Sequence, residues 1–266
     1  MNLDQIRKLI NTISELWKKK LLIYNFSMMD LKIRYRNSIL GFLWTVLEPL
    51  LILTILYLVF TNMFDTKIDN FPLYILLGLI LWNMFQKGTT IGLNSLVSRG
   101  GIITQIYFPR EIPAISASLT SLYMVFFEII IFGLFLVAFQ FTPSVTILIL
   151  PLIILLEFVL LLGTNLALSV LNARFKDIQF IWAVVLQGGF FLTPIFYKLD
   201  ILPEPLQQIL YFSPLVHIVE MAQDVVLYDK LPSLENVGMG IITSFAVLLI
   251  GYLIFRKMEP RVIEEL

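Results

Sequence analysis

Three carboxylates, those of Glu48, Glu128 and Glu157, lie within long apolar runs of this 266-residue chain. A lone carboxylate in lipid is costly, so it normally faces protein or water and is a candidate for proton or substrate chemistry. Glu48 precedes Pro49, which distorts a helix, and is the acid best placed for a function, although a structural role is an equal alternative. We interpret Glu128 and Glu157 as protonated groups that hydrogen-bond between helices. The three acids are too scattered to form a proton relay across a membrane.

Aromatic residues are abundant, with 22 Phe, 10 Tyr and 4 Trp, and they gather in two places. Aromatic faces pack against the C–H face of sugars, while ring edges tolerate water, so such clusters suit a sugar-conducting path. An interfacial belt combined with core packing is the alternative explanation for the same rings. The candidate path-lining residues are Trp44, Tyr57, Phe60 and Phe64 in one cluster and Phe190, Phe191, Phe196 and Tyr197 in the other.

Several kinds of chemistry have no matching residues in this sequence. No G-x-x-x-x-G-K-[ST] sequence is present, so the chain has no P-loop with which to use ATP, and HExxH and GxSxG are also missing. The chain has no cysteine, which excludes disulfides and thiolate zinc sites within it. We expect a structural role for the single histidine, His217, and no metal or cofactor site. The formal net charge of zero implies no nucleic-acid partner.

The composition is that of a membrane protein. Apolar residues make up 58% of the chain and charged residues 14%, against about 45–50% and about 25% in ordinary soluble domains. Several windows exceed the apolar length of about 18 residues that indicates a membrane span. We therefore predict an all-α, multi-pass membrane protein whose six transmembrane helices cover approximately residues 39–61, 71–91, 113–139, 144–171, 178–197 and 236–255.

The basic residues predict the orientation of these spans. Of the 19 Lys and Arg residues, only Lys67, Lys198 and Lys230 fall in loops on one side. The other side holds the remaining 16, with Lys87 assigned to the loop after the second span. Because basic loops stay in the cytoplasm, both termini are predicted to be cytoplasmic and the protein to lie in the cytoplasmic (inner) membrane.

Two segments lie outside the spans. Apolar residues recur at helical spacing near the N-terminus, opposite a basic face, which predicts an amphipathic helix at the cytoplasmic interface of the membrane. This gives a division into residues 1–36, the interfacial helix and basic segment, and residues 37–266, the six-span domain. The external loop 198–236 contains two stretches too short to span, punctuated by prolines, and we predict two short re-entrant helices there.

Three stretches resemble the permeases of type-2 ABC exporters for polysaccharides, which carry O-antigen, capsule and teichoic-acid chains. They are "LKIRYRNSILGFLWTVLEPLL", "LVSRGGIITQIYFPREIPAISA" and "NARFKDIQFIWAVVLQGGFFLTPIFYKLDILPEPLQQILYFSPL". The resemblance implies a homodimer joined to two copies of an ABC ATPase subunit, which binds ATP and Mg²⁺. It further implies export of a glycan attached to an undecaprenyl-type lipid, and within the family the last stretch favours O-antigen over teichoic acid.

The resemblance also implies roles for the basic segments. Short cytoplasmic turns between spans are candidates for docking on the ATPase, and their residues are Arg99, Phe108, Arg110, Arg174, Phe175, Lys176 and Asp177. A lipid-linked diphosphate would enter from the inner leaflet near Lys32, Arg34 and Arg36, beside Glu48. The alternative is that these basic residues only fix the orientation of the spans by the positive-inside rule and neither dock the ATPase nor bind the lipid.

Other functions remain open at this point. A type-2 ABC permease for teichoic acid, a drug or a lipid is one alternative. A secondary carrier that works without ATP is another, but such carriers usually contain inverted repeats with broken helices, which are missing here. An enzyme acting on lipid-linked sugars would need a cluster of metal ligands in the internal loops, and these loops offer none.

Overall fold

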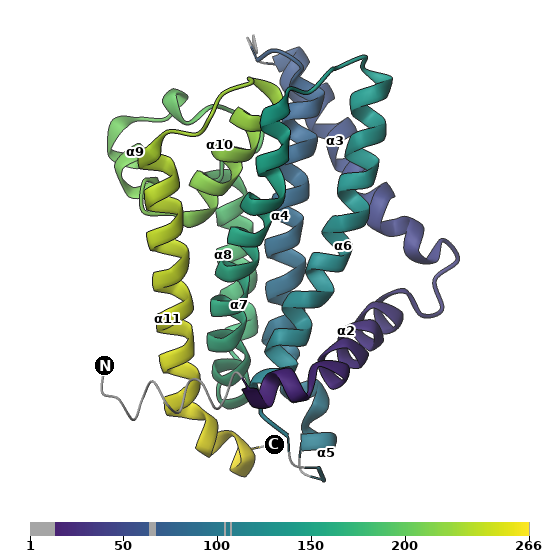
Figure 1. Ribbon diagram of the computed structural model, residues 1–266, viewed down its shortest axis with the longest axis vertical. Coiled ribbons are helices and arrows are strands. Elements are labelled where there is room, and N and C mark those ends of the chain that lie inside the picture. The colour runs from purple at the N-terminus through teal and green to yellow at the C-terminus, as the bar shows by residue number, and fades with distance from the viewer. Residues whose placement is uncertain (1–13, 64–67, 104, 107, 266) are drawn as a thin grey trace.

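The computed structural model describes residues 14–63, 68–103, 105–106 and 108–265. Helix makes up 82% of the structure, and the described residues contain no strand, which confirms the predicted all-α class. Long helices run roughly parallel to one another in a bundle, and a shorter helix slants across one end of it (Figure 1). The helices are α2 (Lys20–Tyr35), α3 (Trp44–Met63), α4 (Phe71–Asn94), α5 (Gly100–Ile103), α6 (Glu111–Ala138), α7 (Leu150–Arg174), α8 (Ile178–Leu192), α9 (Glu204–Leu210), α10 (Pro214–Leu227) and α11 (Leu234–Glu265).

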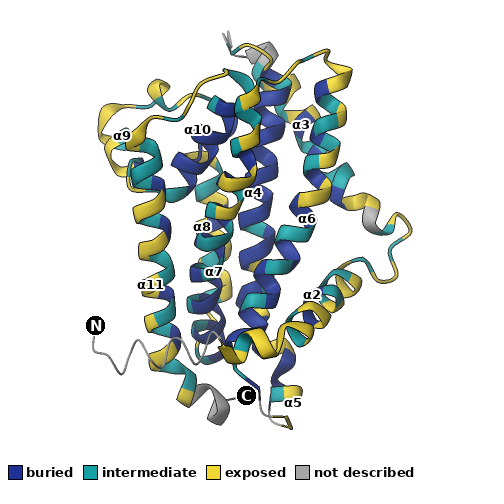
Figure 2. Ribbon diagram, viewed as in Figure 1, coloured by how far each residue is buried: buried dark blue, intermediate teal, exposed yellow. Residues whose placement is uncertain are grey.

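Helix α4 forms the centre of the bundle. It is buried along most of its length, and α3, α6, α7 and α10 pack around it (Figure 2). From Phe71 to Phe85 nearly every residue is buried, so this part of the helix has no polar stripe to place toward water. Gly78 permits close contact, because a Cβ there would meet the backbone of Ile195. Helix α4 therefore contributes more side chains to the main core cluster than any other helix, with partners from α3, α6, α7, α8 and α10.

Helices α7 and α11 pack tightly against each other. Gly163 of α7 faces Gly251 of α11, and a Cβ on either residue would collide with the backbone of the other helix. Without side chains at this point the two backbones approach closely, which is how small residues join helices inside membranes. Helix α7 of this pair also packs against α4, so α11 joins the bundle mainly through α7.

Helix α8 ends earlier than the predicted fifth span, because Pro194 cannot continue a helix. The chain from Thr193 to Phe196 is buried although it is not helical. The hydroxyl of Tyr74 donates a hydrogen bond to the carbonyl oxygen of Tyr197 at 2.8 Å, and the amide of Gln223 donates to that of Pro194 at 3.1 Å. The side chains of Tyr74 and Gln223 thus supply hydrogen bonds to carbonyl groups that have no helical partner after α8 ends.

Helices α9 and α10 form a pair bent by 96°, and α10 begins at Pro214. His217 holds the bend: its Nε2 lies 2.6 Å from the carbonyl oxygen of Tyr211, and its Nδ1 lies 3.3 Å from Oδ1 of Asn236. The ring joins this pair to the start of α11. The position is consistent with the structural role expected for His217.

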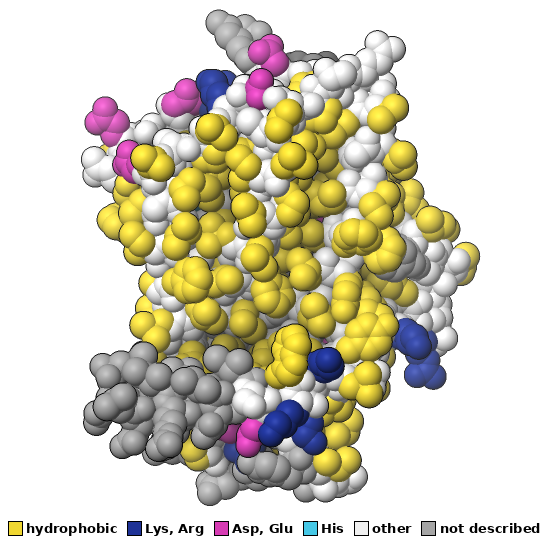
Figure 3. Space-filling model, in the orientation of Figure 1, with side chains coloured by type: hydrophobic (Ala, Val, Ile, Leu, Met, Phe, Trp, Pro, Cys, Tyr) yellow, Lys and Arg dark blue, Asp and Glu magenta, His cyan; other side chains and the backbone are white. Residues whose placement is uncertain are grey.

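Among the described residues, three helices are long and apolar enough to cross a membrane, namely 111–138, 145–174 and 234–260, or four if the bent α9–α10 pair counts as one span. The apolar helices 44–60 and 178–192 are shorter. Apolar side chains cover the middle of the visible face (Figure 3). Most visible Lys and Arg side chains lie near the end that carries α2 and α5, and most Asp and Glu side chains lie near the opposite end (Figure 3). We call these the basic end and the acidic end.

Candidate functional site

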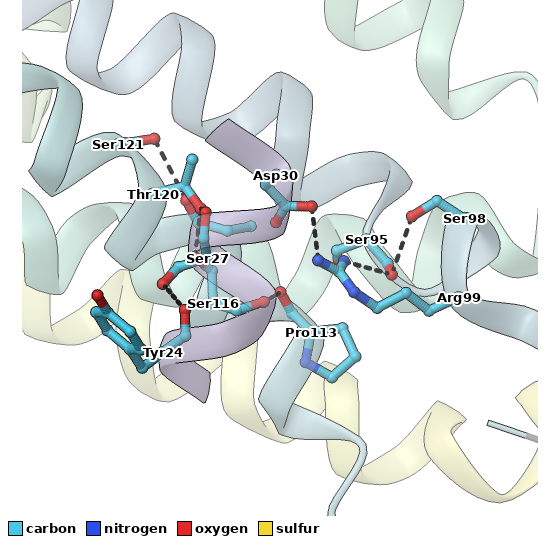
Figure 4. Close-up of polar contacts among 11 residues, drawn as sticks. Tyr24, Ser27, Asp30, Ser95, Ser98, Arg99, Pro113, Ser116, Thr120 and Ser121 are labelled. Carbon is cyan, nitrogen blue, oxygen red and sulfur yellow. Dashed lines mark hydrogen bonds and ion pairs between the residues drawn. The ribbon is translucent and has the colours of Figure 1, made fainter. Parts of the chain in front are cut away.

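An ion pair at the basic end fastens α2 to the segment after α4. The guanidinium of Arg99 donates to a carboxylate oxygen of Asp30 at 2.6 Å and to the carbonyl oxygen of Ser95 at 3.2 Å (Figure 4). The same guanidinium lies 4.7 Å from the ring centre of Phe26. Arg99 is only 6% exposed, so its side chain contacts α2 and leaves little surface for another protein.

Two further residues of the predicted coupling loop also contact other parts of the chain. Phe108 is buried, with its ring centre 5.8 Å from that of Phe26. Arg110 donates to the backbone carbonyl of Glu259 at 3.3 Å, which ties the start of α6 to the end of α11. Near them, a guanidinium nitrogen of Arg256 lies 3.4 Å from the carboxylate of Glu111. This loop therefore links α2, α6 and α11 at the basic end.

The turn between α7 and α8 differs, because most of its side chains are exposed. Phe175, Lys176 and Asp177 are exposed, and the guanidinium of Arg174 lies 5.1 Å from the ring centre of Phe175. A partly exposed arginine beside an exposed aromatic ring is a composition typical of protein–protein interfaces. Four consecutive residues here thus present both charge and apolar surface at the basic end.

A polar pocket lies beside the Arg99–Asp30 pair, and we call it the basic-end pocket. Its volume is about 300 Å³. Of the predicted entrance residues, Lys32, Arg34 and Arg36 are all exposed on or just after α2, but only Arg34 lines this pocket. The polar residues lining it are Asp30, Arg34, Thr90, Asn94, Ser98 and Arg99.

Lys87 joins two of the intramembrane acids. Its ammonium nitrogen lies 2.9 Å from Glu48 of α3 and 3.3 Å from Glu128 of α6. Our assignment of Lys87 to a loop was wrong: α4 continues to Asn94, and Lys87 is 5% exposed inside the bundle. One charge within an apolar stretch is a weak signal in the sequence, but α4 packs directly against α3 and α6, and Lys87 is the partner that their two acids need. Glu157 is fully buried, but its carboxylate oxygens have no hydrogen-bond partner among the described residues, so the interhelical hydrogen bond expected for Glu157 is not found, whereas Glu128 accepts one from Lys87.

The structure brings together only some of the aromatic residues that were predicted to line a path. Phe60, Phe190, Phe191, Phe196 and Tyr197 form one cluster, in which the ring centres of Phe60 and Phe196 are 4.7 Å apart. Trp44 and Tyr57 lie on exposed parts of α3, at 43% and 39% exposure, and Phe64 lies outside the described residues.

Further rings that sequence reasoning missed extend this cluster along α4 and α8. The ring of Trp82 lies 5.8 Å from Phe190, and that of Phe85 lies 6.2 Å from Trp182. They adjoin an apolar cavity of about 450 Å³ between α4, α7, α8 and α11. Trp82 and Phe85 lie three residues apart in the second predicted span, a helical spacing that could have marked them in the sequence.

An all-helical bundle with an apolar middle and oppositely charged ends defines an integral membrane protein. The chain belongs to the ABC-2 type transporter family, whose sequence pattern it matches over residues 23–227. This confirms the family resemblance and the predicted inner-membrane localisation.

Relatives in three organisms cover nearly the whole chain. The O-antigen export system permease protein RfbA of Klebsiella pneumoniae is 29% identical over 88% of this chain and 91% of its own. The protein of the same name in Myxococcus xanthus is 28% identical over 85% and 88%. The polysialic acid transport protein KpsM of Escherichia coli is 24% identical over 91% and 95%.

Proposed function

We propose that this chain is the membrane subunit of an ATP-driven exporter, and that it moves a lipid-linked polysaccharide of the O-antigen kind across the inner membrane. Similarity along nearly the full length to permeases named for O-antigen export is the observation that carries the proposal. Capsule-type relatives match at lower identity, which favours O-antigen over polysialic acid.

We also propose six spans with both termini in the cytoplasm. The basic end then faces the cytoplasm, as the positive-inside rule requires. Helices α3 and α8 act as the first and fifth spans, and the bent α9–α10 pair dips into the outer leaflet without crossing it. The polar groups that Tyr74, Gln223 and His217 supply to non-helical backbone support this arrangement, because unpaired backbone groups are not tolerated at membrane depth.

The glycan path lies between two copies of the chain. Helices α3 and α8 carry exposed apolar residues on their outer sides, including Leu51, Ile55, Val184 and Phe191. A second copy that faced these helices would enclose a path lined by the aromatic cluster. Ring faces along such a path would stack on sugars, as the sequence predicts.

A separate ABC ATPase in two copies supplies the energy and binds ATP and Mg²⁺. The exposed turn 174–177 is the main docking element. Arg99, Phe108 and Arg110 act differently: they pass a displacement of the loop to α2 and α11, with which they form contacts. Closure of the ATPase dimer would then move packed helices as rigid bodies.

Transport in inside-out membrane vesicles tests the proposal. Vesicles that contain this chain, its ATPase and a lipid-linked O-antigen should accumulate glycan in the lumen when ATP is added. Vesicles with an ATPase subunit that binds but does not hydrolyse ATP should accumulate none. Glycan uptake driven by an ion gradient, with the ATPase removed, would overturn the proposal in favour of a secondary carrier.

A further inference from the structure

The apolar cavity of about 450 Å³ beside the aromatic cluster lies between α8 and its neighbours, and we call it the α8 cavity. Leu186 is the one buried residue of α8, a helix that the structure describes in full. At Gly189 the helix lies against α4, since a Cβ there would meet the ring of Trp82 at 3.0 Å. An apolar helix with so little packing needs another apolar surface against it.

The α8 cavity opens between α8 and α11. Val185 and Leu192 of α8 and Ile250 of α11 line the cavity, and all three side chains are exposed. Ile250 lies halfway along α11, so in this membrane protein the opening is at the depth of the lipid hydrocarbon. An empty apolar cavity would leave its lining without van der Waals partners on one side. A hydrocarbon chain that enters from the bilayer supplies those contacts.

The size of the α8 cavity fits one such chain. A cavity of about 150 Å³ holds one benzene ring of six carbons, so a cavity of about 450 Å³ has room for roughly eighteen carbons. The part of α8 that lines it runs from Trp182 to Leu192, which is about 15 Å along a helix and about half of the hydrocarbon core of a bilayer. Leu210 and Pro214 of the α9–α10 pair line the cavity toward the acidic end. These dimensions are those of one extended phospholipid acyl chain.

Two indole groups line the α8 cavity without a hydrogen-bond partner. The Nε1 atoms of Trp82 and Trp182 are buried, and neither has an acceptor among the described residues. The hydroxyls of Thr164 and Thr193, by contrast, donate to carbonyl groups of the preceding helical turn. Trp182 lies near the start of α8 at the basic end, and this interfacial depth is where a phospholipid carries its ester carbonyls. An acyl ester therefore offers Trp182 an acceptor, whereas an isoprenoid tail has no carbonyl.

We propose that the α8 cavity holds one acyl chain of a bilayer phospholipid, and that the indole N–H of Trp182 donates to the ester carbonyl of this chain. The acyl chain supplies the packing surface that α8 lacks and keeps this helix in place beside α7 and α11. In the proposed orientation the lipid belongs to the cytoplasmic leaflet. The binding itself requires only that the protein lies in a membrane.

Quenching of tryptophan fluorescence tests the site, because bromine on a lipid chain quenches indole emission only at close range. The chain has four tryptophans, and Trp17→Phe with Trp44→Phe leaves the two that line the cavity. This reporter variant is placed with the ATPase in nanodiscs of phosphatidylcholine, with or without bromine on the acyl chains. The brominated lipid should remove most of the emission.

Matched variants show where the quenching lipid lies. Ala167→Phe places a ring in the cavity and should restore most of the emission. Leu155→Phe enlarges an exposed residue of the same helix outside the cavity and should leave the quenching unchanged. Adding Trp182→Phe to the reporter leaves only Trp82, which is 2% exposed, so its quenching requires a chain in the cavity. This last variant keeps the test decisive if Ala167→Phe does not assemble.

The choice of host lipid tests the hydrogen bond to Trp182. A small fraction of brominated ester lipid should quench the reporter more strongly in ether-linked phosphatidylcholine, which has no ester carbonyl, than in the ester-linked host. Equal quenching in the two hosts would exclude this hydrogen bond.

Three outcomes would overturn acyl-chain binding. The first is a reporter that keeps its emission in brominated nanodiscs, and the second is an Ala167→Phe variant quenched as strongly as the reporter. The third is recovery of the emission on addition of unbrominated undecaprenyl phosphate at low mole fraction, which would identify the occupant as an isoprenoid tail. Glycan transport by the wild type in vesicles is measured separately, so the lipid site can fail while the proposed function stands.

Discussion

The ammonium of Lys87 on α4 lies 2.9 Å from the carboxylate of Glu48 on α3, and it also contacts Glu128 of α6 at 3.3 Å. One lysine thus joins three helices within the apolar part of the bundle. Glu48 is 44% exposed at its side chain, whereas Glu128 is 2% exposed. The two acids therefore differ in their need for Lys87, because only Glu128 has no access to solvent or lipid headgroups.

Replacing Lys87 should destabilise the protein. Lys87→Met leaves the buried Glu128 without its cation, and loss of one partner of a buried pair costs about 3–5 kcal/mol. Thermal unfolding of the purified protein in detergent measures this loss. Adding Glu128→Gln to Lys87→Met should recover most of the stability, because no buried charge then remains unpaired. A double variant as unstable as the single one would contradict the assigned pairing.

Breaking the Arg99–Asp30 pair should loosen α2. Asp30→Asn removes the acceptor charge of a 2.6 Å contact, and a hydrogen bond to a charged group contributes about 1.5–3 kcal/mol. Hydrogen exchange of the α2 amides should become faster, while that of α7 is unchanged. Co-purification with the ATPase should persist, since both side chains face inward. Loss of the ATPase with unchanged exchange in α2 would instead place Arg99 at the docking surface.

Charge reversal in the turn after α7 should prevent docking. Lys176→Glu, alone or with Arg174→Glu, changes the charge of an exposed turn without disturbing the core, so the protein should still insert into the membrane. The measurement is the amount of ATPase retained on the affinity-purified permease, which we expect to fall at least about tenfold. Lys198→Glu, an exposed change at the acidic end, is the matched control. Equal retention in all variants would exclude this role of the turn.

The contact between Gly163 and Gly251 should not tolerate a methyl group. Gly251→Ala forces α7 and α11 apart, and overpacking of this kind costs about 1–3 kcal/mol. Gly238→Ala on the same helix meets nothing within 4 Å and should be neutral or slightly stabilising, because Ala favours helices over Gly. The thermal unfolding midpoints of the two purified variants are compared with each other. Equal midpoints for Gly251→Ala and Gly238→Ala would contradict the close packing of α7 on α11.

Substitutions of two neighbouring rings in the aromatic cluster should have different effects, one on glycan transport and the other on stability. Phe191 is 62% exposed, while Phe196 is 7% exposed. Phe191→Ala should reduce glycan transport and leave the unfolding midpoint nearly unchanged. Phe196→Ala should lower stability by about 3–5 kcal/mol through the cavity it creates. Normal transport by Phe191→Ala would indicate that the exposed rings of α8 only contact lipid.

Sequence patterns predicted the helices well where one signal dominates. The apolar run 71–91 was predicted as a helix and forms most of α4. The prolines at 203 and 214 were predicted as helix starts, and α9 and α10 begin there. Both signals can be read from a few neighbouring residues, without knowledge of the tertiary contacts. The fifth helix was predicted five residues too long, since Thr193 to Tyr197 remain apolar after Pro194 has ended the helix. The six-span count and the cytoplasmic termini stay predictions.

The candidate site was less predictable, because its chemistry depends on contacts between distant helices. The single charge of Lys87 resembled a loop residue until Glu48 and Glu128 were seen around it. Arg99 and Arg174 look alike in sequence, as basic residues beside short turns. Only the fold shows that Arg99 is buried against Asp30, whereas Arg174 begins a turn whose next three residues are exposed.

Helix α11 runs from Leu234 to Glu265, a length of nearly 50 Å at about 1.5 Å per residue. At its first turn Glu235 accepts a hydrogen bond from Tyr211, and near its last turns Glu259 lies beside Arg110. The part of α11 before Pro260, from Leu234 to Glu259, is therefore held at both of its ends. In the proposed orientation, a tilt that the ATPase imposes on α11 at the basic end would move the α9–α10 pair at the other end directly, so opening of the exit would need no separate connecting element.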